Sequence, residues 1–277
     1  MKSKIHEHQR ITRVSKKIIF LFVLATTLFS CSNEDISNPT EVLQKVVFYR
    51  DSPNERQWNI DNDLLTNITL ADGTVVEEFV YDSENRVISD IKYTGGIVSE
   101  TNTITYNPDN TINTINGLAY TYNAATRTYT YSYGSSFTIN CQVNSDFLVE
   151  NFVRTGTDAI EYHMTYTNGN MLSFEKSTSG TTDVIKNFHF DGTYGANPLY
   201  SAVISVAKVK SLTDPSFFID CQISENMANG FDKGTTDPYY YNYGLVFSDR
   251  FYQYGVEILD DSNNYIGYYT FASYYFQ

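Results

Sequence analysis

The amino-acid sequence predicts an all-β fold, an antiparallel meander of repeated β-hairpins that forms a long, twisted or curled sheet. Short segments of alternating aromatic or β-branched and polar residues, separated by turn residues, support this prediction, and no window shows a convincing helix of three or more turns. The clearest segment is Thr128–Tyr133, where tyrosines occupy one face and hydroxyl residues the other. So many strands cannot stay flat, and we expect the sheet to curl or to split into two packed layers.

The first 30 residues have the pattern of a secretory signal. Lys16 and Lys17 precede an apolar stretch over residues 18–29, and the small residue Ser30 stands directly before Cys31. About twelve apolar-leaning residues are too few to cross a bilayer as a helix. The sequence from Leu28 to Cys31 resembles the lipobox of bacterial lipoproteins, which implies cleavage before Cys31 and lipidation of its thiol. An ordinary secretory signal with an incidental cysteine is the alternative.

Residues 31–41 are expected to be a polar linker that joins the lipidated cysteine to the folded domain. The acidic run from Ser32 to Asp35 resembles the lipoprotein export signal of Bacteroidota. That resemblance implies an outer-membrane lipoprotein exposed at the cell surface, with the periplasmic face as the alternative. The lipid bilayer is therefore an expected partner, bound through the acyl anchor.

The chain after the signal is strongly acidic. Residues 1–30 carry six basic residues and one acid, so the remaining 247 residues hold 13 basic and 31 acidic side chains, a formal charge of −18. Phosphate backbones repel such a chain, which excludes nucleic acid as a partner. Cys141 and Cys221 remain after Cys31; an extracytoplasmic setting permits a disulfide between them, and two small buried residues in strands are the alternative.

Turn residues separate the expected strands through the first half of the chain. Glycine, asparagine and aspartate tolerate positive φ or bond their own backbone, so their clusters predict hairpin turns. These clusters are Asp72-Gly73, Asp82-Ser83-Glu84-Asn85, Gly95-Gly96, Asn107-Pro108-Asp109-Asn110 and Asn168-Gly169-Asn170.

The hairpins also resemble one another. An aromatic residue closes one strand, a polar turn follows and an aliphatic residue opens the next strand, around Tyr81, Tyr106 and Tyr166. The stretch from Tyr81-Asp82 to Asn85-Arg86-Val87 resembles the YD repeat of Rhs-type proteins, and the other copies lack the aspartate. With the signal and lipobox, the chain resembles small Bacteroidota lipoproteins built of Rhs/YD-like hairpins, a family without known catalytic residues. One Rhs/YD-repeat-like all-β domain is thus expected over residues 42–277.

The second half of the chain is less regular. Residues 201–212 come closest to a helix, but their valines alternate with small residues and the pattern is ambiguous. Residues 211–231 interrupt the strand rhythm, with Pro215 and Gly230 among them. Strand character returns over residues 239–277, which we expect to close the same sheet system.

Residues that carry chemistry are scarce. His163 and His189 are the only histidines after the signal, and each is expected on the polar face of a strand. No transition-metal motif is present, and the acidic residues lie mainly in turns. We therefore expect no enzyme activity, no cofactor and no metal.

Aromatic side chains are the remaining indication of binding. Exposed aromatic rows on a sheet are surfaces that sugars and protein partners bind. The candidates, which rank after a packing role, are Tyr239, Tyr240, Tyr241, Tyr243 and the single tryptophan, Trp58. The leading functional hypothesis is a non-catalytic structural, adhesion or partner-binding role at the cell surface. A glycan-binding accessory lipoprotein is the alternative, and a hydrolase with dispersed carboxylates is a third hypothesis.

Overall fold

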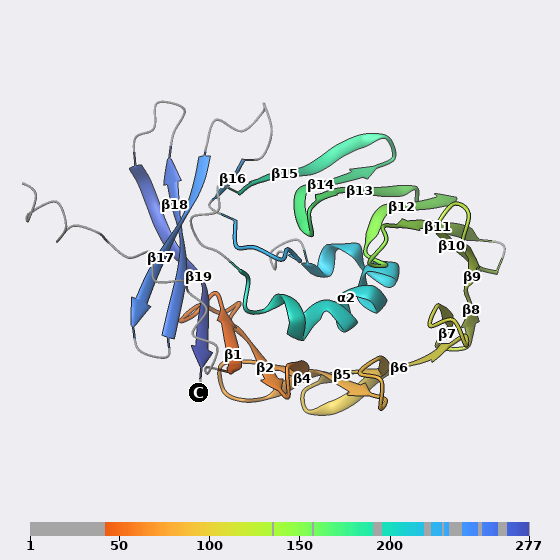
Figure 1. The fold of residues 1–277 in the computed structure, drawn as a ribbon, viewed down its shortest axis with the longest axis horizontal. Coiled ribbons are helices and arrows are strands. Elements are labelled where there is room, and N and C mark those ends of the chain that lie inside the picture. Colours follow the sequence, from red (N-terminus) through yellow and green to blue (C-terminus); the bar gives the residue numbers. More distant parts are fainter. Residues whose placement is uncertain are drawn as a thin grey trace, which may run out of the picture. The chain divides into compact units, whose positions relative to one another are not determined.

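The chain folds predominantly into antiparallel β-strands, as the sequence predicts (Figure 1). The computed structural model describes residues 42–134, 136–156, 158–190, 196–218, 223–228, 230–232, 240–248, 251–259 and 265–276. Cys31, the signal and the polar linker lie outside the described residues. In the part of the chain that is described, no helix has the length and apolar character needed to cross a membrane.

The elements follow one another in short succession. They are β1 (Leu43–Phe48), β2 (Arg56–Asp61), β3 (Leu64–Thr69), β4 (Val75–Tyr81), β5 (Val87–Thr94), β6 (Ile97–Tyr106), β7 (Ile112–Ile115), β8 (Leu118–Ala119), β9 (Thr121–Asn123), β10 (Thr128–Tyr133), β11 (Phe137–Val143), β12 (Val149–Gly156), β13 (Ile160–Thr167), β14 (Asn170–Thr178), β15 (Thr181–His189), α2 (Tyr200–Thr213), the 3₁₀ helix η1 (Pro215–Phe218), β16 (Gly230–Asp232), β17 (Tyr240–Ser248), β18 (Phe251–Leu259) and β19 (Tyr265–Phe276).

Nearly every strand pairs with its neighbour in the sequence, which confirms the predicted meander. From β1 to β8 each strand pairs with its neighbour in the chain, and the same holds from β9 to β19. The pairing of β1 with β19 joins the two series. The pairing of β15 with β16 spans the helical segment. The first and last described strands are therefore side by side, and the ends of the series, β8 and β9, are consecutive in the chain.

Four hairpin turns share one hydrogen-bond pattern that bends the sheet. In the turn after β4, the N–H of Asp82 donates to the carbonyl of Arg86 at 3.0 Å, and the N–H of Asn85 donates back to Asp82 at 3.1 Å. The same pattern recurs at residues 70–74, 107–111 and 144–148. A bulge adjoins each turn, and bulges increase local bending and twist. These repeated turns and bulges are a local physical cause of the expected curling of the sheet.

A 14-residue helix, α2, corrects the expectation that the chain has no helix of three or more turns. Its pattern was ambiguous because the polar residues Lys210 and Ser211 are among its eight buried residues, so the division into an apolar and a polar face is weak in the sequence. Asn197 helps to start it, since its side-chain oxygen accepts the Leu199 N–H at 3.0 Å. Pro215 follows directly after the C-cap Asp214 and begins η1, as a helix stop favours.

Strands from distant parts of the series contact this helix. β3, β5 and β12 all pack against α2, and in Figure 1 the helix lies between β5 and β12. The hydroxyl of Tyr131 on β10 donates to the carbonyl of Leu212 at 2.6 Å, and Ser205 donates to the carbonyl of Asn85 at 2.8 Å. The core therefore consists of the inward side chains of the strands closed over the buried residues of α2.

Asn85 tests the repeated turn, because its φ of 59° places it in the left-handed region. We expect Asn85→Ala to lower the free energy of unfolding by about 1 kcal/mol, because the left-handed backbone conformation is less favourable for alanine than for asparagine or glycine. Asn85→Gly should keep the wild-type value in urea unfolding followed by circular dichroism. Glu84→Ala, at the preceding turn position, is the control. Equal stability of the alanine and glycine variants would contradict the stabilising role of the left-handed conformation at residue 85.

Candidate functional site

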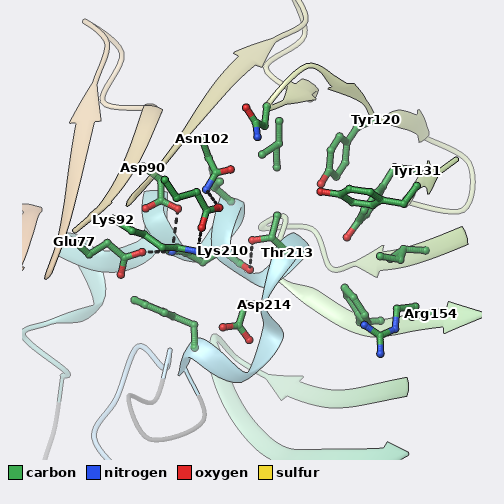
Figure 2. Close-up of a pocket in the computed structure, with 18 of the residues that line it drawn as sticks. Glu77, Asp90, Lys92, Asn102, Tyr120, Tyr131, Arg154, Lys210, Thr213 and Asp214 are labelled. Atoms are coloured by element: carbon green, nitrogen blue, oxygen red, sulfur yellow. Dashed lines mark hydrogen bonds and ion pairs between the residues drawn. The ribbon is translucent and has the colours of Figure 1, made fainter. Parts of the chain in front are cut away.

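A cavity of about 630 Å³ lies between the sheet and the C-terminal end of α2. Its wall comes from β4, β5, β6 and β7, from β10, β11 and β12, and from the end of α2 with η1. Figure 2 shows Glu77, Asp90 and Lys210 gathered on one side, with Tyr120, Tyr131 and Arg154 across from them. The volume falls within the range of about 300–1,000 Å³ that small-molecule sites occupy.

Strand alternation places polar side chains inside this cavity. On β6, Glu100 and Asn102 line the cavity two residues apart, and Ile104 on the same face continues into the core. On β5, Asp90 and Lys92 share the cavity-facing side in the same way. The inner face thus changes from apolar to polar along the strands.

The side chain of Lys210 forms the centre of a buried charge cluster. Its Nζ donates to Oε1 of Glu77 and, at 2.9 Å, to Oδ2 of Asp90. The side chains of Lys210 and Asp90 are each 6% exposed, and that of Glu77 is 11% exposed. The rings of Phe217 and Phe79 lie 5.0 Å and 5.7 Å from Nζ, within the range of cation–π attraction.

Burial decides the protonation of this cluster. It raises the pKa of Glu77 to about 7, because loss of water penalises the charged form, and the nearby Asp90 acts in the same direction. Lys210 opposes the rise through its charge and its hydrogen bond. Two carboxylates share one ammonium group here, and Glu77 holds a proton below about pH 7.

The opposite wall is aromatic. The rings of Tyr120 and Tyr131 stack with centroids 4.2 Å apart and planes 28° apart. Burial raises the pKa of both phenols well above its usual value, so both stay neutral. Because the Tyr131 hydroxyl donates to the last turn of α2, this wall is fixed to the helix.

More exposed polar and aromatic groups line the rest of the cavity. Lys92 pairs with Glu100 at 2.9 Å, and Asn102 donates to the same carboxylate at 2.7 Å. Tyr133 is 55% exposed, and its ring centroid lies 5.1 Å from that of Phe137. The guanidinium of Arg154 lies over the Phe137 ring at 5.7 Å. The cavity therefore combines a buried charged wall with an accessible aromatic edge.

Trp58 is the predicted binding residue whose side chain is described, and it does not line this cavity. Trp58 is 4% exposed and packs edge-on against Phe48 and stacked on Phe217, so the expectation that it binds a ligand at the surface is wrong. Its large apolar ring gains more from core burial than a half-exposed strand could offer. Tyr240, Tyr241 and Tyr243 belong to β17, but their side chains are not among those described. Tyr239 lies outside the described residues.

Cys141 and the two histidines lie in strands, as expected, and the disulfide stays a prediction. Cys141 is a free, fully buried thiol on β11, and its possible disulfide partner Cys221 lies outside the described residues. His163 and His189 are exposed strand residues, paired with Asn151 at 2.5 Å and with Asp232 at 3.0 Å. Within the described ranges, no group of three or more histidine, cysteine, aspartate or glutamate side chains is placed to hold a metal ion.

The sequence did not indicate the cavity residues, and the reason is physical. Glu77 and Asp90 lie in strands, whereas acidic residues were expected mainly in turns. In an alternating pattern a carboxylate indicates the outer face, and only a buried partner reverses that assignment. The partner, Lys210, comes from α2, more than 100 residues later in the chain. The sequence contains one indication of this buried partner, since Lys210 stands within the largely apolar stretch of residues 201–212.

Stability should depend on pH through Glu77. Its folded-state pKa lies above its unfolded value, so its stabilising contribution is complete below about pH 4.5 and is lost as the pH rises through about 7. We expect the free energy of unfolding of wild type, relative to Glu77→Gln, to fall between pH 5 and pH 8 in urea titrations. Glu78→Gln, at the next position of β4, controls for loss of a strand carboxylate. If the free energy of unfolding of wild type, relative to Glu77→Gln, instead rises with pH, the raised pKa of Glu77 is contradicted.

Comparison with known proteins yields structural similarity only. No protein-family model and no curated protein sequence matches the chain. A porin-like protein from Bacteroides uniformis is 12% identical with a TM-score of 0.42, covering 85% of this chain and 97% of that one. A porin-like protein from Bacteroides vulgatus is 7% identical with a TM-score of 0.27, covering 69% of this chain and 98% of that one. These values establish neither a family nor a function for this chain.

Proposed function

We propose that the chain is a lipid-anchored, surface-exposed binding protein that acts without catalysis, and that the cavity beside Lys210 receives its ligand. The sequence around Cys31 supports the anchor, since a basic, apolar and small-residue pattern precedes the cysteine. The observation that carries the binding role is the cavity itself, which combines aromatic walls with a few convergent polar groups, as ligand sites commonly do.

The state of the carboxylates favours binding over hydrolysis. Glu77 and Asp90 are both held by Lys210, and Glu100 is held by Lys92. The fourth acid of the wall, Asp214, accepts hydrogen bonds from the backbone and hydroxyl of Ser216. A glycosidase needs two carboxyl groups facing each other across the scissile bond. Here each acid is already bound to a neighbour.

The hairpin from Tyr81 to Val87 is proposed to be a degenerate repeat of the YD type. Asn85 occupies the left-handed position where such repeats commonly have glycine, and Asp82 pairs with Arg86 at 2.6 Å. The Tyr81 hydroxyl donates to the Leu65 carbonyl at 2.6 Å, which ties this hairpin to the preceding one. Tyr106 makes the corresponding bond to the Val87 carbonyl at 2.8 Å. Tyr81 and Tyr106 therefore each link their hairpin to the one before.

Anchoring is tested at Cys31. We expect Cys31→Ala to move the protein from the membrane fraction to the soluble fraction and to abolish labelling with an alkyne-tagged fatty acid, because a tether needs its acyl chains. Ser32→Ala is the matched control and should stay membrane-bound. Protease treatment of intact cells then reports surface exposure. Continued labelling of Cys31→Ala would refute lipidation at this residue, and full protection from protease would refute surface exposure.

Ligand binding is tested by filling the cavity. We expect compounds from a library of saccharides, nucleosides, amino acids and organic acids to raise the melting temperature of the wild-type protein. Asn102→Trp should abolish the shift, since the indole occupies cavity volume. Thr101→Trp, on the opposite, exposed face of β6, should retain it. A library without any stabilising compound, or a shift equally present in both variants, would refute the proposed site.

A further inference from the structure

Among the described residues, none donates a hydrogen bond to one carboxylate oxygen of the cavity wall. Lys210 binds Oδ2 of Asp90, whereas Oδ1 is buried and accepts no hydrogen bond from the described residues. An unpaired buried acceptor is costly, and buried polar groups are normally satisfied. Asp90 lines the cavity, so its carboxylate is a group that a hydrogen-bond donor of a ligand would stabilise.

The charges around the cavity largely compensate one another. Lys92 faces Glu100, and Lys210 faces both Glu77 and Asp90. Arg154 and Asp214 add to the charged lining, which among the described residues has four acids against three bases. Glu77 carries a proton for part of the neutral range, which reduces the remaining imbalance. Such a wall favours an uncharged ligand with many hydrogen-bonding groups over an anion or a strong cation.

The accessible edge offers an aromatic surface. Tyr133 is 55% exposed and lies beside Phe137, and both line the cavity. The electron-rich face of an aromatic ring attracts the weakly positive C–H groups of a pyranose ring. Hydroxyl donors for a carboxylate and a C–H face for an aromatic ring occur together in saccharides.

From these contacts we propose that the cavity binds the terminal unit of a neutral oligosaccharide, with one hydroxyl donating to the carboxylate of Asp90 and the sugar ring lying against Tyr133. This inference rests on the proposed binding function and adds the class of ligand. It moves the glycan contact from the surface tyrosines expected near residue 240 to the cavity beside α2.

Calorimetric titration of the full-length chain in a non-glycosidic detergent tests this class directly. The probes are neutral trisaccharides of glucose, mannose and xylose, with tri-galacturonate and tri-glucosamine as the anionic and cationic comparators. We expect at least one neutral trisaccharide to bind at least about tenfold more tightly than both comparators. Tighter binding of a charged comparator would overturn the inference.

Two variants locate the contact. Asp90→Asn and Tyr133→Ala should each weaken binding of that trisaccharide about tenfold, the scale of one charge-assisted hydrogen bond or one stacking contact. Tyr133 is exposed, so its variant keeps the test valid if Asp90→Asn unfolds. Tyr93→Ala, a β5 tyrosine that does not line the cavity, should bind as wild type does. Unchanged binding in every folded cavity variant would overturn the inference.

Failure of the ligand class is distinguishable from failure of the binding function. If no trisaccharide binds but another compound class gives a shift that Asn102→Trp abolishes, the saccharide inference is wrong and the binding function stands. If no compound of any class gives such a shift, both are wrong.

Discussion

The buried ammonium of Lys210 is the constraint on which the arrangement of helix and sheet depends. A charge this deeply buried needs partners, and Glu77 on β4 and Asp90 on β5 supply them. Loss of one partner from such a cluster typically costs about 3–5 kcal/mol, because an uncompensated charge stays behind. Three elements that are far apart in the chain therefore share one fixed geometry, and the cavity lies where that geometry leaves space.

The repeated hairpin turn provides the curvature that makes room for the helix. A left-handed residue and an adjacent bulge recur in four turns, and each bends the sheet in the same local way. Tyrosine hydroxyls such as those of Tyr81 and Tyr106 bond to the preceding hairpin and maintain the spacing between hairpins. A sheet curved in this way must cover an apolar object, and α2, with its buried valines and alanines, fills that position.

The proposed binding function uses a region of the described core where charged side chains are buried. Near the end of α2, polar groups replace aliphatic ones on the inner face of β4, β5 and β6, while Tyr120 and Tyr131 maintain the packing opposite them. Polar groups retained in a core at a cost in stability are commonly found at binding sites. An anchor at Cys31 would hold this cavity at the membrane surface, so that a tethered domain meets ligands from outside the cell.

The sequence alone determined the strands, the turns and the antiparallel meander, because a period of two and the φ tolerance of glycine and asparagine are local properties. Turns at Asp82–Asn85 and Asn107–Asn110 occur where those residues predict them. Tertiary structure decided the rest. The helix became visible only when the sheet buried it on several sides, and Trp58 proved to be a core residue once Phe48 and Phe217 packed against it. The cavity depends on Lys210 meeting Glu77 and Asp90 across more than 100 residues of chain, and no local pattern contains that contact.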